Sequence, residues 1–173
     1  PHMPFKAVLM AILISPMIVP LIITAAGMFF FYSKIGLTHT YLGLILAHTA
    51  LGTPFVVITV TATLTGFDTN LIRASQSLGA DTMRTFFKVI MPLILPGVIS
   101  GGLFAFITSF DEVVIVMFIG SVEQITIPKQ MWAGLRQETS PVILCMATCL
   151  VALSIALLTT VEMLRRRSER LRG

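Results

Sequence analysis

The segment LIRASQSLGADTMRTFFKVIMPLILPG, from Leu71 to Gly97, decides the fold because it places charge and helix-breaking residues inside a very apolar chain. The chain has 173 residues, of which 55% are hydrophobic and 12% are charged. Soluble domains carry roughly 25% charged residues. Half of that share predicts a membrane protein, and a segment as polar as this one must then lie outside the lipid.

Long runs without Lys, Arg, Asp or Glu separate the charged positions. A helix needs about 20 mainly apolar residues to cross a bilayer. The sequence therefore predicts an all-α membrane protein, a single domain over residues 1–173 with four spanning helices. The apolar run within residues 1–31 is too long for a secretory signal peptide. The four spans are predicted near residues 8–31, 42–64, 90–119 and 141–163.

The basic residues favour one side of the membrane. With four spans, both termini and loop 66–89 share a side, which holds nine of the twelve Lys and Arg residues, and loops 32–41 and 120–140 hold the other three. Cytoplasmic loops carry the excess of Lys and Arg. Loop 66–89 and the basic tail 164–173 are therefore predicted to be cytoplasmic. This tail accounts for much of the net charge of +4, which is no evidence for nucleic-acid binding.

The cytoplasmic loop is predicted to form a pair of short helices. Asp68 and Asn70 are candidate N-caps of the first helix, and Gly79 stands where glycine commonly ends one. Asp81 can cap the second helix, which carries an aromatic face on one side and Arg84 on another. Such a pair is predicted to dock on a cytoplasmic protein. A loop that merely lies on lipid headgroups is the alternative.

Two acids stand in the third predicted span, in the sequence SFDEVVIVMFIG. Ionisable residues in a span are costly and usually face a cavity or a partner. Asp111 and Glu112 have two interpretations of equal weight: at least one lines a pathway and attracts a cation, or they are structural acids held by internal bonds. A helix over residues 89–120 would be roughly 48 Å long, so bending is expected. The predicted bending points, at its cytoplasmic end, are Pro92, Pro96, Gly97, Gly101 and Gly102.

Further signals lie in the first two spans. Pro16 and Pro20 predict a break in the first span, because proline removes a helical hydrogen bond. Small and hydroxylated residues in the second span, such as Gly52 and Thr59, predict close helix packing. His48 is predicted to be a packed histidine bonded to a backbone carbonyl, and a proton or cation site is the less favoured alternative.

The last loop and span carry four more signals. Pro128 is expected in the first turn of a short helix. Trp132 on that helix is expected at the membrane interface, and stacking on a ligand is the alternative. Cys145 and Cys149 share a helix face, where packing is favoured over metal binding because no His or acid accompanies them. No metal site is predicted.

The cytoplasmic loop resembles that of permease subunits of binding-protein-dependent ABC importers. Their motif reads E-A-A, three residues, G, nine residues, I-x-L-P, and Gly79 and Pro92 occupy its glycine and proline. Arg73 replaces the family's acid, which is a charge reversal. The resemblance implies that this loop couples the permease to an ATPase. The implied coupling residues are Arg73, Ala74, Ser75, Gly79, Ala80, Asp81, Arg84, Phe86, Phe87 and Pro92.

The resemblance covers nearly the whole chain. The segments LISPMIVP, AHTALGTPFVV, GLFAFITSFDEVV and TIPKQMWAGLRQETSP look like the polyamine (spermidine/putrescine) group of these permeases. Family members usually have six spans, so the chain is expected to hold the last four. The resemblance implies a multi-pass protein of the bacterial cytoplasmic (inner) membrane, with both termini cytoplasmic and loop 120–140 periplasmic. Asp111, Glu112 and Trp132 are the expected substrate-pathway residues.

The resemblance also implies partners and a division of labour. The chain is expected to be a transport subunit and not an enzyme, with no cofactor of its own and no G-x-x-x-x-G-K-[ST] phosphate loop. ATP and magnesium would bind in a partner ATPase present in two copies. A second permease subunit, a periplasmic or extracellular solute-binding protein and membrane lipid complete the expected partners.

Two other functions are considered. A secondary transporter or ion channel would use Asp111, Glu112 and His48 without an ATPase. A non-transporting scaffold would use residues 71–91 only for docking. Within the importer family, an opine or an amino-acid derivative is the alternative to a polyamine.

Overall fold

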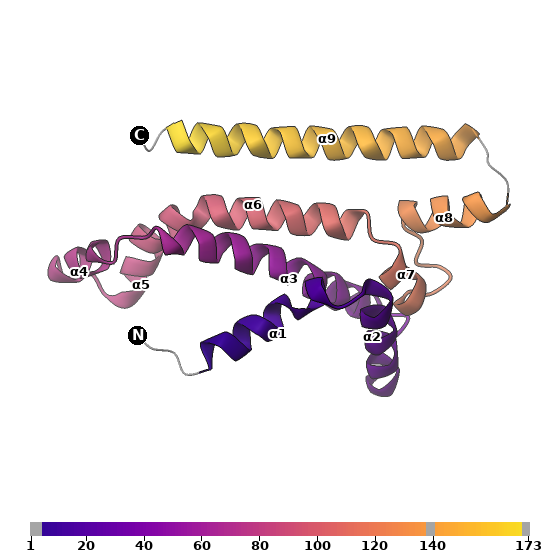
Figure 1. Cartoon of the computed structure of the whole chain (residues 1–173), viewed down its shortest axis with the longest axis horizontal. Coiled ribbons are helices and arrows are strands. Elements are labelled where there is room, and N and C mark those ends of the chain that lie inside the picture. Colours follow the sequence, from indigo (N-terminus) through magenta and orange to yellow (C-terminus); the bar gives the residue numbers. More distant parts are fainter. Residues whose placement is uncertain (1–4, 138–140, 171–173) are drawn as a thin grey trace.

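The computed structural model describes residues 5–137 and 141–170, and every regular element within these ranges is helical. Helices α3 and α6 lie side by side along the molecule, with α4 and α5 at one end and α2, α7 and α8 at the other (Figure 1). The elements are α1 (Lys6–Ile18), α2 (Leu21–Ile35), α3 (Tyr41–Thr65), α4 (Asn70–Ser77), α5 (Thr82–Thr85), the π-helical segment η1 (Phe86–Ile90), α6 (Met91–Phe110), α7 (Val114–Ile119), α8 (Ile127–Gln137) and α9 (Pro141–Arg170).

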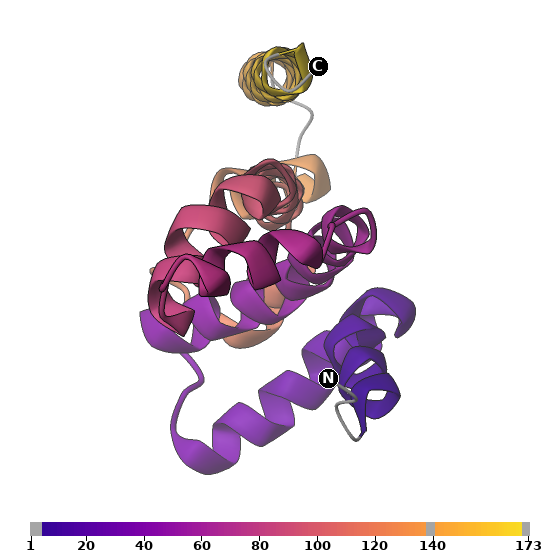
Figure 2. The ribbon, with the colours of Figure 1, turned by 90° about the vertical axis from the view of Figure 1, so that its left-hand side faces the viewer.

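Three helical stretches are long and apolar enough to cross a membrane: Tyr41–Thr65, Thr82–Phe110 and Pro141–Thr160. The bent pair α1 and α2 makes a fourth if it is counted as one span. The all-α membrane fold predicted from the sequence is confirmed. Seen along its long axis, the molecule has α9 on one side, α3 and α6 in the middle, and α1 and α2 on the other side (Figure 2).

The predicted break in the first span is present and large. Helix α1 ends at Ile18, Val19 is extended, and Pro20 precedes the first residue of α2, so the two helices meet at 110°. Because proline has no amide hydrogen and a fixed φ, it suits this position before a helix better than a helix interior. The bend lets α1 pack along α3 and lets α2 cross to α7.

The buried core lies where α2, α3 and α7 meet. Fully or nearly fully buried apolar side chains from these three helices form one cluster there, and it fastens the end of the molecule that is opposite α4 and α5. The cluster consists of Ala25, Tyr32, Ala47, Leu51, Ile115 and Ile119.

Helices α3 and α6 pack very closely through small residues, as the second span predicted. The Thr59 Oγ1 hydroxyl donates to the Gly97 carbonyl oxygen over 2.9 Å. A Cβ atom added at Gly101 would lie 2.3 Å from Thr59 Oγ1, and one added at Gly52 would lie 2.8 Å from the Ala105 Cβ. Small residues allow this approach in membrane helices, where dispersion contacts and interhelical hydrogen bonds drive association.

The third predicted span differs from the expectation of one helix over 90–119. The continuous helix runs from Thr82 to Phe110, and a break at residues 111–113 separates it from α7. The expected bends at Pro92 and Pro96 are instead accommodated within a helix. The Met91 amide donates to the Phe86 carbonyl, five residues back, so the chain passes through a π-helical turn just before Pro92, which has no amide hydrogen to donate.

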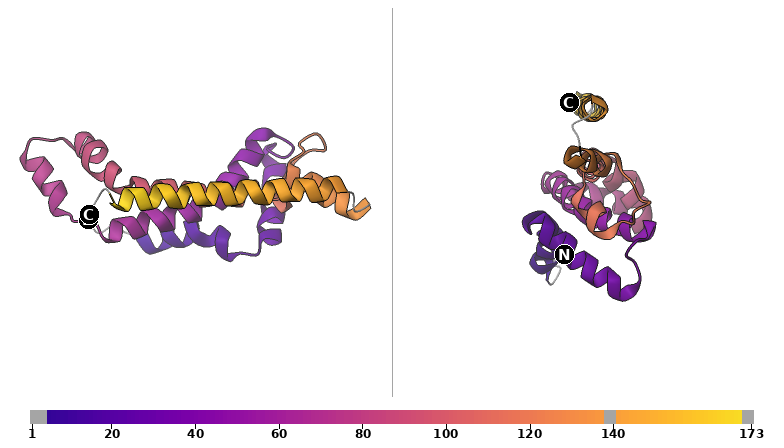
Figure 3. Two further views of the ribbon diagram at one scale, coloured as in Figure 1. Left: turned by 90° about the horizontal axis from the view of Figure 1, so that it is seen from above. Right: turned by 90° about the vertical axis from the view of Figure 1, so that its right-hand side faces the viewer.

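Helix α9 contributes least to the core. It runs along the molecule over α6 (Figure 3), and none of its most apolar window is buried. Cys145 and Cys149 are both exposed, so the predicted packing of these thiols does not occur within the described part of this chain. In a bilayer, the apolar surface of α9 would contact lipid or another subunit.

Candidate functional site

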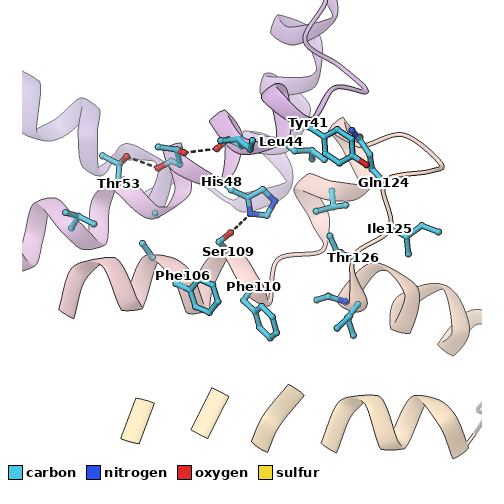
Figure 4. Close-up of a pocket in the computed structure, with 18 of the residues that line it drawn as sticks. Tyr41, Leu44, His48, Thr53, Phe106, Ser109, Phe110, Gln124, Ile125 and Thr126 are labelled. Carbon is cyan, nitrogen blue, oxygen red and sulfur yellow. Dashed lines mark hydrogen bonds between the residues drawn. The ribbon is translucent and has the colours of Figure 1, made fainter. Parts of the chain in front are cut away.

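A cavity of about 940 Å³ opens beside the α3–α6 pair, at the end of the molecule near α7 and α8 (Figure 4). Helix α3 supplies one wall, the last turns of α6 supply another, and the segment from Glu123 to Pro128 closes the side. The lining residues are Tyr41, Leu44, Ile45, His48, Thr49, Gly52, Thr53, Val56, Val57, Ala105, Phe106, Ser109, Phe110, Val116, Glu123, Gln124, Ile125, Thr126, Ile127 and Pro128.

A side-chain bond joins the two helices inside the cavity. His48 Nδ1 lies 2.8 Å from the Ser109 hydroxyl oxygen, so α3 and α6 are tied at this level (Figure 4). The predicted packed and hydrogen-bonded histidine is thus present, but its partner is a hydroxyl and not a backbone carbonyl. Close packing at Gly52 and Ala105, one turn further along both helices, makes this bond possible.

The hydroxyl groups of the α3 wall donate within their own helix. Thr49 Oγ1 donates to the Ile45 carbonyl at 2.7 Å, and Thr53 Oγ1 donates to the Thr49 carbonyl at 2.8 Å. A hydroxyl that donates its one hydrogen still has acceptor capacity on its oxygen. This wall can therefore accept hydrogen bonds from a solute that carries donors.

The segment that closes the cavity is held by its own bonds. Gln124 is buried, and its Oε1 accepts from the Ser121 amide at 2.8 Å. The Lys129 ammonium donates to the Ser121 carbonyl at 2.7 Å and to the Gln124 carbonyl at 3.1 Å. Pro128 lies in the first turn of α8, as predicted. Lys129 thus fastens the loop to the start of the helix that follows it.

The three predicted pathway residues do not line this cavity. Asp111 is exposed at the end of α6, and Trp132 on α8 is 43% exposed. Glu112 is buried, and its Oε1 accepts from the Ile115 amide at 2.9 Å, so it caps α7. This geometry matches the structural-acid alternative for Glu112. The role of the three residues in a pathway stays a prediction.

The structure brings out residues that the sequence did not single out. Glu123 and Gln124 stand in a loop whose fold is not visible as a periodic pattern, and acids in loops are usually solvated. Tyr41 and Ser109 look like ordinary span residues in the sequence. The crowding of small, hydroxyl and histidine residues in HTALGT, from His48 to Thr53, is the one sequence signal that pointed here.

The opposite end of the α3–α6 pair carries the predicted helical hairpin. Gly79 has a φ of +81° and ends α4, and Asp81 Oδ1 accepts from the Arg84 amide at 2.6 Å and caps α5. Both predictions are confirmed. The Ser75 and Thr85 hydroxyl oxygens lie 2.9 Å apart, and Thr85 is buried. This bond holds α4 against α5.

Most of the predicted coupling residues face outward. The Phe86 and Phe87 rings meet edge to face with centroids 5.1 Å apart, and Phe87 is 58% exposed. Within the described ranges, the hairpin thus presents an apolar and basic surface that no other element of this chain covers. The exposed coupling candidates are Arg73, Ala74, Gly79, Asp81, Arg84, Phe86, Phe87 and Pro92, and the half-buried ones are Ser75 and Ala80.

No group of three or more His, Cys, Asp or Glu side chains comes together as a metal site in the part of the chain that the structure describes. The bonds of the cavity instead involve hydroxyl, imidazole and amide groups. The arrangement is suited to holding and passing a solute, and it does not place a nucleophile beside a general base and an oxyanion site as acyl-transfer chemistry requires.

Comparison with known proteins agrees with this geometry. Spermidine/putrescine transport system permease protein PotC of Haemophilus influenzae is 30% identical over 152 residues, 88% of this chain and 59% of the relative. The PotC protein of Escherichia coli K12 is 29% identical over 150 residues, 87% of this chain and 57% of the relative. Putrescine transport system permease protein PotI of the same strain is 28% identical over 145 residues, 79% of this chain and 51% of the relative.

The chain therefore spans somewhat more than half the length of these curated relatives. A solved structure of the MetNI methionine ABC transporter in an inward-facing conformation has the same fold, with a TM-score of 0.73 and 21% identity over 94% of this chain and 73% of that chain. The family model described as "binding-protein-dependent transport system inner membrane component" matches residues 2–170. The chain belongs to this family of membrane permease components.

Proposed function

We propose that the chain forms part of the translocation path of an ATP-driven importer whose solute is a polyamine such as spermidine or putrescine. Family membership supports a transport role, and the names of the three curated relatives support the solute. The observation that carries the proposal is the placement of a cavity and an exposed hairpin at opposite ends of the same two helices.

The exposed hairpin is the proposed coupling site. Its aromatic and basic surface, with Phe86, Phe87 and Arg84, would fit a groove on an ATPase subunit. Two ATPase subunits would bind ATP and magnesium, and a second permease subunit would complete the path. A solute-binding protein would deliver the polyamine at the other side. None of this chemistry falls to the present chain, which supplies the path and the lever.

The orientation follows from charge and fold together. The start of α1, the α4–α5 hairpin and the final turns of α9 lie toward the same end of the molecule (Figure 1). Nine of the twelve Lys and Arg residues belong to that side. An excess of basic residues marks the cytoplasmic side, so we place both termini and the hairpin in the cytoplasm and the cavity toward the periplasm of a bacterial inner membrane.

The mechanism that fits is alternating access. Closure of the ATPase pair would push on the hairpin, and the close packing of α3 against α6 at Gly97 and Gly101 would carry that motion along the pair as one body. Interfaces packed at this density move between discrete arrangements and do not deform continuously. The cavity at the far end would then open alternately to the two sides.

The test is uptake by the assembled transporter in proteoliposomes. Radiolabelled putrescine and spermidine should accumulate only with internal ATP and the external binding protein, and a partner ATPase that cannot hydrolyse ATP should abolish accumulation. Uptake driven by a proton gradient without any ATPase would instead establish a secondary transporter. Accumulation of an opine or an amino-acid derivative in place of both polyamines would retain the importer and replace the solute.

A further inference from the structure

The cavity has a lining that is mostly apolar and carries one carboxylate. Glu123 is the acid among its lining residues, and none of them is Lys or Arg. Tyr41, Phe106 and Phe110 add aromatic rings, whose faces attract cations. His48 uses Nδ1 on Ser109. The electrostatic preference of the cavity for a solute charge is therefore set largely by Glu123.

The loop that carries Glu123 is a built feature and not a loose strand of chain. The residue beside it, Gln124, is only 7% exposed and is tied to Ser121 through both its side chain and its amide. Lys129 donates to two carbonyl oxygens of the same loop. These bonds hold the Glu123 backbone at the rim of the cavity, while its side chain remains exposed.

The two acids at the α6–α7 break are placed differently. Glu112 is buried and gives a carboxylate oxygen to the Ile115 amide, so its charge stabilises the start of α7. Asp111 is exposed but does not line the cavity. Of the three acids at this end of the molecule, Glu123 is the one whose position suits direct contact with a solute.

We propose that Glu123 selects for cationic solutes by accepting an ammonium group at the rim of the cavity. An ammonium that leaves water needs acceptors, and the Thr49 and Thr53 hydroxyl oxygens on the α3 wall offer further ones. The alkyl part of the solute would lie along Phe106 and Phe110. The inference rests on the proposed function, because it assigns a specificity-determining residue to that same cavity.

The test measures the charge preference of the cavity without requiring transport. In the complete transporter in membrane vesicles, the exposed native Cys145 and Cys149 are changed to Ser, and Thr53→Cys places one thiol in the cavity. The rates of labelling by a cationic trimethylammonium-ethyl and by an anionic sulfonatoethyl methanethiosulfonate are compared at low salt. Glu123→Gln should lower the cation-to-anion rate ratio about fourfold, as expected for unit charges roughly 10 Å apart in water.

Three further variants make the assignment specific. Glu123→Asp keeps the charge and should keep the ratio. Asp68→Asn removes an equal charge at the opposite end of α3 and should leave the ratio unchanged. Asp111→Asn should lower it less than Glu123→Gln does. An unchanged ratio in Glu123→Gln, or an equal fall in Asp111→Asn, overturns the inference.

Uptake then separates the inference from the function on which it rests. With the native residue at position 53, Glu123→Gln should reduce the maximal rate of putrescine uptake, while Glu123→Asp should retain most of it. If the labelling ratio falls but the transporter with native Glu123 takes up neither putrescine nor spermidine, Glu123 still selects cations and the proposed solute is wrong. If uptake is normal and the ratio does not change, the importer stands and the role of Glu123 is refuted.

Discussion

The two ends of the α3–α6 pair are built in opposite ways. At one end, the chain between the helices is folded into a hairpin whose apolar side chains face outward, such as Met83 and Phe87 at 67% and 58% exposure. At the other end, the helices enclose a cavity and are braced by α7 and α2 around a buried core. Between them, Gly97 and Gly101 bring the two backbones together.

This difference separates the tasks of the molecule along its length. The hairpin end is made for contact with something outside the chain, since its surface has no cover within the described ranges. The cavity end is stabilised from within, and its polar groups are bonded in place. The tightly packed middle is what allows an event at one end to reach the other, so variants of the middle, the hairpin and its surface should rank in that order.

The largest effect is expected in the middle, from Gly101→Val. An added Cβ would lie 2.3 Å from Thr59 Oγ1 and 2.7 Å from the Val56 Cα, so the helices must separate. Overpacking of this kind costs about 1–3 kcal/mol. We expect a lower melting temperature of the purified complex and loss of uptake.

Gly102→Val is the matched control for this variant, because a Cβ at Gly102 meets nothing within 4 Å. It should leave both measurements near those of the unmodified protein. Equal damage from the two changes would show that the helix itself, and not the α3–α6 contact, is sensitive to valine.

The second effect concerns the hairpin backbone. Gly79 has a φ of +81°, a conformation that costs other L-residues roughly 1–2 kcal/mol. Gly79→Val should therefore redirect α5 relative to α4 and reduce uptake per ATP hydrolysed, while the spans stay folded. The measurement is the ratio of uptake to ATPase rate in proteoliposomes.

Gly66→Val is the comparison, since Gly66 also has open space around it but a φ of −89°. It should keep the ratio of uptake to ATP hydrolysis. Unchanged coupling in Gly79→Val would count heavily against the hairpin as the coupling element.

A smaller effect is expected from the bond that holds the hairpin closed. Ser75 Oγ donates to the Ile72 carbonyl, which leaves the buried Thr85 hydroxyl to donate to Ser75 Oγ. Ser75→Ala would strip Thr85 of this acceptor, at a cost of about 1–3 kcal/mol for an unsatisfied buried group. We expect faster amide hydrogen exchange in residues 70–77 and weaker coupling.

Ser77→Ala serves as control, because the exposed Ser77 hydroxyl bonds only within α4, to the Arg73 carbonyl. Combining Ser75→Ala with Thr85→Val should cost less than the sum of the two single changes, since the double variant leaves no orphaned hydroxyl. Strict additivity would contradict a direct bond between these two side chains.

The smallest effect is expected at the surface of the hairpin. Arg73 is exposed and replaces the acid found at this point of the importer motif. Arg73→Glu should change uptake by no more than about twofold, as surface substitutions typically fall within about 0.5 kcal/mol. A large loss of ATPase-coupled uptake would instead show that the reversed charge is matched by a reversed charge on the ATPase subunit.

The hairpin was predictable because its signals are local. Asp81 caps a helix three residues away, and Gly79 ends one where the backbone turns left-handed, so neighbouring residues suffice to place them. The break after Phe110 was not predictable in the same way. Asp111 and Glu112 interrupt an apolar run, and the sequence suggested a ligand as readily as it suggested a cap, whereas the buried Glu112 is satisfied by the Ile115 amide.

The cavity itself was beyond the reach of the sequence. Its walls come from α3, from α6 and from a loop that follows α7, so its shape depends on tertiary packing and not on any periodic pattern. Glu123 looked like a solvated loop acid until the bonds of Gln124 and Lys129 placed its loop against Tyr41 and His48. Sequence reasoning found the outer loop noteworthy but chose Trp132 within it.

The π-helical turn at η1 has a consequence for how this chain can vary in length. Its Met91 amide reaches back five residues to Phe86, so the turn holds one residue more than an α-helix would. Removing one residue there would restore ordinary helical spacing but rotate everything that follows by about 100°. Ser109 would then turn away from His48. The number of residues in η1 is thus constrained by a hydrogen bond at the far end of α6.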